Sequence, residues 1–388
     1  MTTAAISLPP MQRPFLFAAI ALAAGLFVHL SGSGAKLPAL FAVAMGMGGA
    51  LYHAAFGFTG TYRRAFLEKD ITGITAQLLM LGAAMLLFAP VLAEGQIFGH
   101  GVSGAIAPVG VSVIFGSFIF GIGMQLGGGC GSGTLFTAGG GNLRMVLVLV
   151  FFCIGGLWGS FDLGWWSSLP GIGSVALGKK FGWGPAMALQ LAALGLIYLG
   201  LRKLGGENKR SLWWENGFSW QSLLRGPWPL LLSAGLLALF NWLTLLIAGH
   251  AWSVTWAFTL WAGKAAVFLG WDLSSTWFWS GGFASRALGR SVLLDTTSVM
   301  NIGIMVGAFI AASLAGKVAL KTRIALPSLL AAGIGGLLLG YGARLAYGCN
   351  IGAFFSGVAS TSLHGWVWIV FALMGNYLGL RLRPLFRL

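Results

Sequence analysis

Charged side chains are scarce in this 388-residue chain. Only 8% of its residues are charged and its mean hydropathy is +0.86, whereas a soluble domain carries about 25% charged residues. A water-facing surface cannot be built from so few charges, which excludes a soluble protein. Segments that alternate between apolar and polar residues are missing as well, which argues against a transmembrane β-barrel.

Several motifs of enzymes and metalloproteins are also missing. There is no Gly-x-x-x-x-Gly-Lys loop to cradle a phosphate, which argues against ATP coupling within this chain. The three cysteines form no Cys-x-x-Cys pair. Cys130 and Cys349 have no His or carboxylate nearby in the sequence, so they fall short of a tetrahedral metal site. We therefore expect a protein that is not an enzyme, with no catalytic group, metal, cofactor or nucleic-acid partner.

Apolar runs of membrane-spanning length recur along the whole chain. About 17–25 apolar residues cross a bilayer core of about 30 Å as a helix, which satisfies its own backbone polar groups in lipid. The sequence therefore predicts an all-α polytopic membrane protein. We interpret the first run as a retained span and not as a cleaved signal peptide. The expected spans are 15–30, 38–56, 71–92, 109–127, 144–164, 184–201, 228–248, 253–271, 298–316, 325–346 and 364–380.

Basic residues outnumber acidic ones by 23 to 8. They gather in the segment "LRKLGGENKRSLWWENG", which contains Arg202, Lys203, Lys209 and Arg210. Because Lys and Arg are retained in cytoplasmic loops, this basic linker, residues 201–229, is predicted to be cytoplasmic and the protein to lie in the inner (plasma) membrane. The net charge of +15 fits this bias, and it would also attract anions.

The chain repeats itself around two glycine–cysteine motifs. "LGGGCGSGTLFTAGGG" begins at Leu126, and "LAYGCNIGAFFSGVAS" begins 219 positions later, at Leu345. This single offset places Cys130 on Cys349 and needs no gap over about forty residues. It also aligns the pairs Gly116–Gly335, Gly121–Gly340, Gly123–Gly342, Gly129–Gly348, Gly133–Gly352, Phe136–Phe355, Phe152–Phe371 and Gly156–Gly375.

A weaker pair of motifs lies upstream, "FGFTGTYRRAF" at residues 56–66 and "SGGFASRALGR" at 280–290. We therefore expect one transmembrane domain, residues 1–388, built from a first repeat at 40–200 and a second at 230–388. Transporters built from internal repeats bind substrate near the membrane midplane, on helices interrupted at corresponding positions. The predicted fold is an internally duplicated bundle in which broken or re-entrant half-helices meet near the membrane centre.

The glycines around each cysteine are expected to break a helix, whereas Gly116 and Gly156 are expected to pack helices closely. Irregular backbone at membrane depth is tolerated where protein or water covers it. A short half-helix would begin near Gly131 and another near Asn350, and each N-terminus would offer free N–H groups to an anion. Gly129 and Gly348 would let the chain turn into these starts.

The ionisable and thiol groups have competing interpretations. Cys130 and Cys349 suggest a reactive or polar use of sulfur near a helix N-terminus, or a disulfide, whereas Cys153 is expected to be a small apolar side chain. Gln125 and Arg344 hold the same offset before their cysteines. The arginines of the upstream motifs could anchor the chain at the interface or contact an anion. Their expected carboxylate partners are Glu68, Asp70 and Asp295.

"GMQLGGGCGSGT", "YGARLAYGCNIGAFFSG" and "GFTGTYRR" together resemble the YeeE/YedE family of sulfur-compound transporters, over nearly the whole chain. The resemblance implies an hourglass of full-length and half-length helices. It also implies that Cys130 and Cys349 are the central cysteines that relay thiosulfate through S–H hydrogen bonds to sulfur. The family's thiosulfate carriers have a further cysteine in the first loop motif, where this chain has Thr59 and, in the second copy, Ala284.

The expected substrate is therefore a small sulfur-containing anion, with thiosulfate as the leading candidate and sulfite or selenium species as others. The predicted pathway residues are Cys130, Cys349, Gly129, Gly131, Gly348, Asn350, Thr59, Gln125 and Arg344. The bilayer and a small soluble sulfur-carrier protein on the cytoplasmic side are the expected partners. Two other interpretations stay open: a membrane thiol oxidoreductase that uses Cys130 and Cys349 as a redox pair, and an assembly or lipid-handling protein whose glycines serve packing alone.

Overall fold

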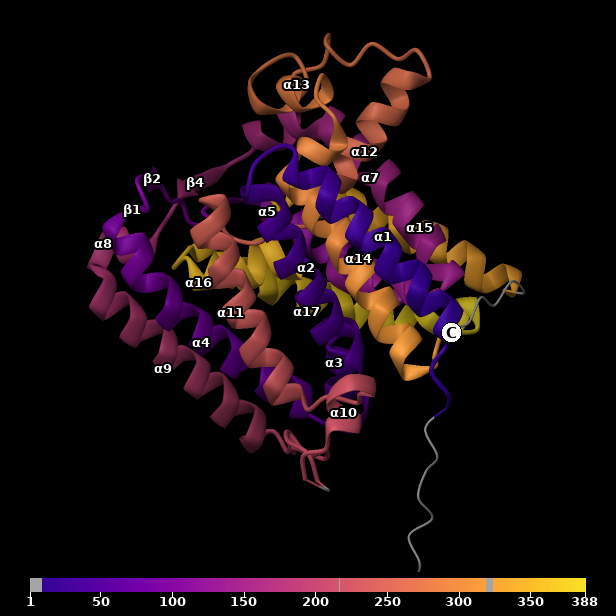
Figure 1. Ribbon diagram of the computed structural model, residues 1–388. Helices are drawn as coiled ribbons and strands as arrows, with labels where there is room; N and C mark the ends of the chain where they lie inside the picture. The colour runs from indigo at the N-terminus through magenta and orange to yellow at the C-terminus, as the bar shows by residue number, and fades with distance from the viewer. Residues whose placement is uncertain (1–8, 216, 319–323) are drawn as a thin grey trace, which may run out of the picture.

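Helices are the main secondary structure of the computed structural model, which describes residues 9–215, 217–318 and 324–388 (Figure 1). The long helices are α1 Arg13–Ser31, α2 Lys36–His53, α4 Thr72–Glu94, α5 Val111–Gly127, α7 Leu143–Ser168, α9 Trp183–Lys203, α11 Leu230–Ala248, α14 Thr296–Ala315, α15 Leu326–Leu345 and α17 Leu363–Leu382. The shorter ones are α3 Phe58–Glu68, α6 Gly131–Gly139, α8 Leu177–Phe181, α10 Trp220–Arg225, α12 Thr255–Phe268, α13 Gly282–Leu288, the 3₁₀ turns Val292–Leu294 (η1) and Arg383–Phe386 (η3), the π-helix Asn350–Phe355 (η2) and α16 Ser356–Ala359.

Ten helical segments within these described residues are long and apolar enough to cross a membrane. The expectation of an all-α polytopic membrane protein is confirmed. One expected span, 253–271, is wrong, because its helix α12 has only 14 residues. At 1.5 Å per residue it reaches about 21 Å, too short for a bilayer core of about 30 Å.

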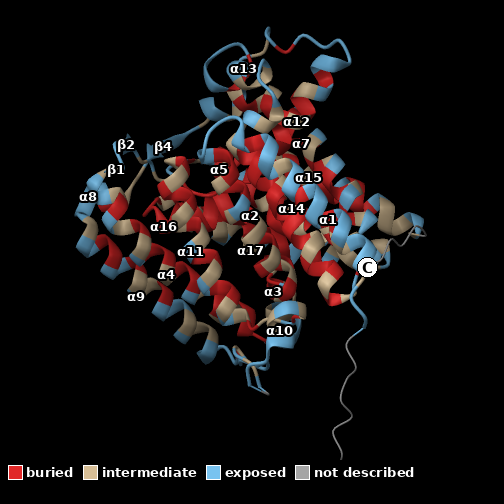
Figure 2. Cartoon of the chain, viewed as in Figure 1, coloured by how far each residue is buried: buried red, intermediate tan, exposed pale blue. Residues whose placement is uncertain are grey.

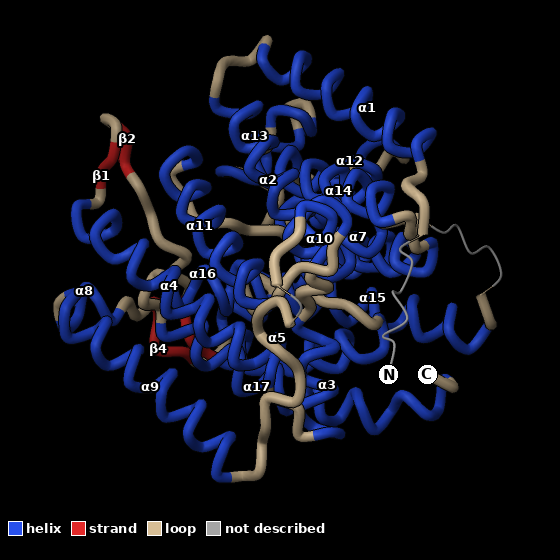
Figure 3. Tube along the Cα trace, turned by 60° about the horizontal axis from the view of Figure 1, so that its bottom comes forward, coloured by secondary structure: helices blue, strands red, loops and turns tan. Residues whose placement is uncertain are grey.

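The strands of the described residues form two short ribbons (Figure 3). In one, β1 Gln96–Ile97 pairs antiparallel with β2 His100–Gly101. In the other, β3 Pro108–Gly110 pairs antiparallel with β4 Gly171–Ser174, and Val109 lies opposite Gly173. The second ribbon joins the connection before α5 to the connection after α7.

The core lies where α5, α7, α15 and α17 cross, and buried residues fill the middle of the molecule (Figure 2). Glycines allow the backbones to approach each other there. A Cβ on Gly121 of α5 would overlap the carbonyl oxygen of Ala372 in α17, and a Cβ on Gly340 of α15 would overlap that of Phe152 in α7. Close backbone approach of this kind is how small residues hold membrane helices together.

The helix contacts come in matching pairs. The contact of α15 with α7 matches the contact of α5 with α17. In the same way, the contact of α2 with α14 matches that of α11 with α4. Gly121 and Gly340, which the 219-residue offset aligns, make the same kind of contact in the two halves. A duplicated chain would give this reciprocity, and the repeat boundaries stay a prediction.

The upstream motifs do not occupy corresponding places. Helix α3 packs against α4 and α17, and the helix that packs in the same way, against α14 and α7, is α12 and not α13. The expected match of residues 280–290 with 56–66 is therefore wrong. Helix α13 instead packs on α12, in a separate apolar cluster that contains Ala284. The counterpart of the loop before α3 is the loop before α12.

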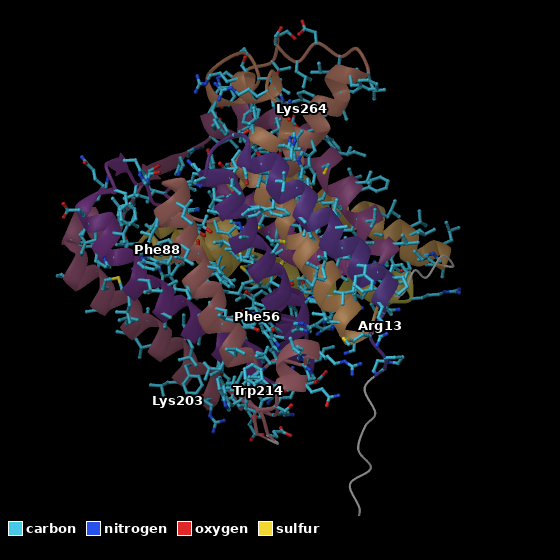
Figure 4. The ribbon with its side chains drawn as sticks, viewed as in Figure 1. Arg13, Phe56, Phe88, Lys203, Trp214 and Lys264 are labelled. Carbon is cyan, nitrogen blue, oxygen red and sulfur yellow. The ribbon has the colours of Figure 1, made fainter. Side chains whose placement is uncertain are left out.

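The bundle has two polar ends. Lys203 and Trp214 lie at one, here called the linker end, and Lys264 of α12 lies at the other, the far end (Figure 4). At the linker end, Asp70 between α3 and α4 accepts a hydrogen bond of 2.8 Å from Arg210. Because α3 ends beside the linker and α12 runs toward the far end, the two half-length helices cover opposite halves of the bundle (Figure 1).

Candidate functional site

Helix α5 ends abruptly before the first cysteine. Gly128 adopts φ +87°, and its N–H donates to the carbonyl of Met124 at 2.9 Å, which terminates the helix. Only glycine adopts this conformation readily. A Cβ on the next residue, Gly129, would lie 3.2 Å from the backbone nitrogen of Thr134. The chain then restarts as α6 at Gly131, so the expected broken helix is present.

Cys130 is the N-cap of α6. Its sulfur accepts a hydrogen bond of 3.4 Å from the N–H of Gly133 and lies 3.5 Å from the hydroxyl oxygen of Ser132. The side chain is 1% exposed. The sulfur therefore lies among free N–H groups at the positive end of a half-helix dipole, where a negative ligand is favoured.

Cys349 caps the second half-helix in the same way. The sulfur accepts from the N–H of Ile351 at 3.4 Å, and the side chain is fully buried. The preceding residues, Tyr347 at φ +56° and Gly348 at φ +149°, make the turn. The π-helix η2 starts at Asn350, as expected, and π-helical turns are frequent at functional sites.

The two cysteine loops meet in the core. The sulfur of Cys349 lies 2.9 Å, and Val254 Cγ1 3.5 Å, from the position that a Cβ on Gly131 would occupy. Val254 is the N-cap of α12, and Phe58, the first residue of α3, directs its N–H toward the sulfur of Cys130. The N-termini of four half-length helices, α3, α6, α12 and η2, therefore converge here. All three cysteines are free, so the alternative of a disulfide is not what this structure shows.

Unpartnered polar groups lie beside the cysteines. Among the described residues, neither the oxygen nor the nitrogen of the Asn350 side chain has a hydrogen-bond partner, although this side chain is fully buried. The same holds for the hydroxyls of Thr59 and Tyr62 on α3, and Tyr62 lies next to Cys130 and Asn350. Leaving a buried polar group unpaired costs about 1–3 kcal/mol. Such a set is therefore what a site for a small polar ligand would present.

Gln125 and Arg344 have different surroundings in spite of their common offset. Gln125 donates to the carbonyl of Thr59 at 3.3 Å and to the side chain of Asn376 at 3.0 Å, so it supports the start of α3. Arg344 instead places its guanidinium 4.8 Å from the ring centre of Phe278, in the far-end loop between α12 and α13, and its Nε has no hydrogen-bond partner in the described part of the chain. Seven of the nine expected pathway residues therefore lie at or around the two sulfurs. Gln125 forms a hydrogen bond to one of these seven residues, Thr59, and Arg344 lies apart.

The carboxylates expected to pair with the upstream arginines do so in part. Asp70 forms an ion pair with Arg64 at 3.8 Å and a closer one with Arg210. Asp295 caps α14 and accepts from the indole of Trp256 at 2.9 Å, and no arginine pairs with it in the described residues. Glu68 likewise forms no ion pair there. These two expectations are wrong for different reasons. Asp295 accepts hydrogen bonds from a backbone N–H and an indole instead of an arginine, and Glu68 is exposed to solvent.

Sequence reasoning missed the loop that precedes α12. The indole N–H of Trp252 is buried without a partner, and Asn301 donates to the carbonyl of Val254 at 2.9 Å. Asn241 accepts from the N–H of Trp252 at 2.9 Å and fixes the loop from the other side. A sequence signal existed: His-Ala occurs at 53–54, before α3, and again at 250–251, before α12.

No group of three or more His, Cys, Asp or Glu able to hold a metal occurs among the residues placed in the structure. The convergent site offers instead N–H groups, thiols, an amide and two hydroxyls, with no carboxylate. This set of donors suits a small anion.

Comparison with known proteins bears on this site. The sequence model of the family described as sulphur transport matches residues 53–378. The chain is 34% identical to the probable transporter YedE of Escherichia coli over 178 residues, 45% of this chain and 43% of YedE, and 33% identical to that of Salmonella typhimurium over 172 residues, 44% and 41%. It is 28% identical to the thiosulfate transporter TsuA of Spirochaeta thermophila over 342 residues, 82% of this chain and 91% of TsuA. The chain thus matches less than half the length of the YedE proteins and most of TsuA.

Proposed function

The chain belongs to the sulphur transport family, and from that premise we propose that it carries a small sulfur-containing anion, with thiosulfate as the leading candidate, across the inner membrane. Family membership and ten helices of spanning length make it a multi-pass membrane protein for the transport of sulfur compounds. One observation carries the finer proposal: Cys130 and Cys349 cap two half-helices whose N-termini meet.

The convergent helix starts would replace the water that the anion loses. Four half-length helices direct free N–H groups and positive dipole ends toward one place, so a divalent anion could be held without a full positive charge. The thiols of Cys130 and Cys349 would then donate weak hydrogen bonds to it in turn. Weak donors suit transport, because a site that binds strongly does not release.

Thr59 bears on which anion passes. Its hydroxyl is buried on the second residue of α3, and no described residue forms a hydrogen bond with it. A hydroxyl can donate to an anionic oxygen or sulfur as a thiol can, and it is the stronger donor of the two. We therefore propose that Thr59 serves in the pathway where thiosulfate carriers of the family have a cysteine, with sulfite and selenium species as the alternative substrates.

The proposed route runs from the far end to the linker end. Arg344 lies half-buried beside the far-end loop and forms no ion pair among the described residues, and Arg286 and Arg290 line a small cavity of about 80 Å³ at the same end, together with Asp295. These cations would attract the anion before it reaches Cys349. Asn350, Tyr62 and Thr59 would bind it between the two sulfurs. A small soluble sulfur carrier would receive it at the linker end.

Growth of a bacterium deficient in sulfate uptake, with thiosulfate as sole sulfur source, tests this function. Wild type, Cys130→Ala, Cys349→Ala and Cys153→Ala are compared at matched expression. Cys153 lies on α7, outside both cysteine loops, where it packs against the main core and the apolar cluster of α12 and α13, and it provides the matched control. We expect wild type and Cys153→Ala to grow and the other two to fail. Uptake of ³⁵S-thiosulfate into the same cells measures the effect directly.

The results separate substrate from mechanism. If wild type fails to grow on thiosulfate but grows on sulfite, or takes up a labelled selenium compound, the substrate assignment would change and the proposed site would stand. Full growth of both loop variants would contradict the relay. The second candidate function is that of a thiol oxidoreductase. Its support is the short distance between the Cys349 sulfur and Gly131, the residue after Cys130. It predicts a mixed disulfide that can be trapped on one of these cysteines during turnover.

A further inference from the structure

A basic groove opens at the linker end, away from the cysteine loops. Its volume is about 890 Å³, and it lies between the last turn of α3 and the end of α17 with the 3₁₀ turn η3. Arg63, Arg381 and Arg383 line it, and so do Phe66 and Tyr377. No acidic side chain does. The groove therefore concentrates positive charge beside an aromatic wall.

The three arginines have no ion pair among the described residues. The guanidinium of Arg381 lies 5.1 Å from the ring centre of Tyr377 and donates to its hydroxyl at 2.6 Å. Like charges gathered in one groove without an ion pair favour a ligand with a negative group, and arginine binds phosphate oxygens through paired N–H donors.

The position of the groove relative to the bilayer indicates a lipid ligand. Helix α17 has 20 residues, about 30 Å, so Arg381 and Arg383 at its end lie where the bilayer core meets the headgroups. Apolar side chains around the arginines remain exposed within the chain: Leu67 is 64% exposed, Leu385 74% and Phe66 40%. A free inorganic anion would use the guanidinium groups and leave this apolar surface uncovered, whereas a phospholipid would occupy both.

We propose that this groove binds an anionic phospholipid, with the phosphate on Arg63 and Arg381 and the acyl chains along Leu67 and Phe66. Basic pockets at the ends of membrane helices bind acidic headgroups, and each Lys or Arg near the surface adds to the attraction. The site is separate from the proposed transport pathway, so it stands whether or not thiosulfate is the substrate. Arg383 also donates to the carbonyl of Gln125 at 2.7 Å, which makes it a support of α5 and unsuitable for the test.

Native mass spectrometry of the detergent-purified protein tests the proposal. Phosphatidylglycerol or phosphatidylcholine is added to wild type, to Arg63→Gln/Arg381→Gln and to the control Arg202→Gln/Lys203→Gln. The control removes two charges at the same end but outside the groove. We expect wild type and control to keep phosphatidylglycerol in preference to phosphatidylcholine. The groove variant should bind it about thirtyfold more weakly, since each surface arginine contributes about a factor of five.

Three results would overturn the proposal. One is equal retention of the two lipids by wild type, which needs no variant. Another is undiminished phosphatidylglycerol binding by the groove variant. The third is a thermal stabilisation by inorganic phosphate as large as that by phosphatidylglycerol, which would assign the site to a free anion. Arg63→Lys/Arg381→Lys keeps the charges and should keep most of the binding, which guards against a variant that simply fails to fold.

Discussion

The sulfur of Cys349 lies 2.9 Å from where a Cβ on Gly131 would stand. That distance is shorter than a normal contact between carbon and sulfur. The Cys349 sulfur, in the second half of the chain, therefore occupies space that is free because Gly131, in the first half, has no side chain. The residue next to Cys130 must be glycine for the two capped half-helices to meet. The approach ties the position of one cysteine loop to that of the other.

Gly131→Ala should therefore separate the two loops. The added methyl group overpacks the contact, which typically costs about 1–3 kcal/mol, and the Cys349 sulfur is the atom that must move. We expect the protein to fold and most ³⁵S-thiosulfate uptake to be lost. Gly352→Ala is the matched control, because its new Cβ would lie 3.5 Å from the Ser253 hydroxyl, an ordinary contact. Equal uptake by the two variants would contradict the prediction.

Asn350 should be needed for uptake and not for stability. Both polar atoms of its buried side chain lack partners, and such groups cost about 1–3 kcal/mol. Asn350→Leu has a similar volume and removes both atoms, so we expect an unchanged or higher melting temperature together with lost uptake. Asn376→Leu is the control for stability: Asn376 bonds to Gln125 at 3.0 Å and to the Ala372 carbonyl at 2.8 Å, so its melting temperature should fall. A lower melting temperature for Asn350→Leu would count against a ligand site.

The sequence allowed the cysteine loops to be located because their signals are local. Glycine clusters around Cys130 and Cys349 break helices whatever surrounds them, and both half-helices start where expected. The pairing of α3 with α12 depends on tertiary packing instead. In the sequence this pairing is marked by a His-Ala dipeptide before each helix. The Gly-Phe and Arg of residues 280–290 resemble residues 56–66 more conspicuously, but the two segments do not correspond in the fold.

Residues at equivalent positions also diverged in ways that an offset does not reveal. Gln125 and Arg344 stand five positions before their cysteines, yet one bonds to Thr59 and the other lies over Phe278. Tyr62 was not expected in the site because a tyrosine on a helix of mixed polarity has many possible places. Its position beside Cys130 follows from the packing of α3. Contacts between halves of the chain therefore had to come from the structure.

Asp70 should stabilise the fold in a pH-dependent way. Burial alone would raise the pKa of this carboxyl, but hydrogen bonds from Thr72 and Arg210 and the charge of Arg210 outweigh it and lower the pKa to about 2. An unfolded Asp has a pKa of about 3.9, so the ionised group contributes about 2 kcal/mol to the free energy of unfolding at neutral pH. This contribution is complete above about pH 5 and is lost as the pH falls through the folded pKa of about 2 toward pH 1.

Melting temperatures of wild type and Asp70→Asn, measured across that pH range, check this contribution. The variant should melt below wild type at pH 7, and the two curves should converge in acid. Glu94→Gln at the exposed end of α4 removes a carboxylate with no ion pair in the described residues, and it should follow wild type throughout. A gap between wild type and Asp70→Asn that is undiminished at about pH 1 would show that the ionised carboxyl is not its source.

Gly121 should be required for assembly of the bundle, because its absent side chain sets the distance between α5 and α17. A Cβ there would overlap the Ala372 carbonyl oxygen and lie 2.8 Å from the Asn376 nitrogen, and both are backbone atoms that cannot turn aside. Gly121→Ala therefore has to separate two helices, at about 1–3 kcal/mol or more. Gly195→Ala on α9 meets nothing within 4 Å, and it should raise stability by about 0.5–1 kcal/mol by removing a flexible residue from a helix. Measured in one detergent, the melting temperature should therefore fall for Gly121→Ala and rise for Gly195→Ala. A shift of both variants in the same direction would mean that α5 and α17 can adjust their spacing.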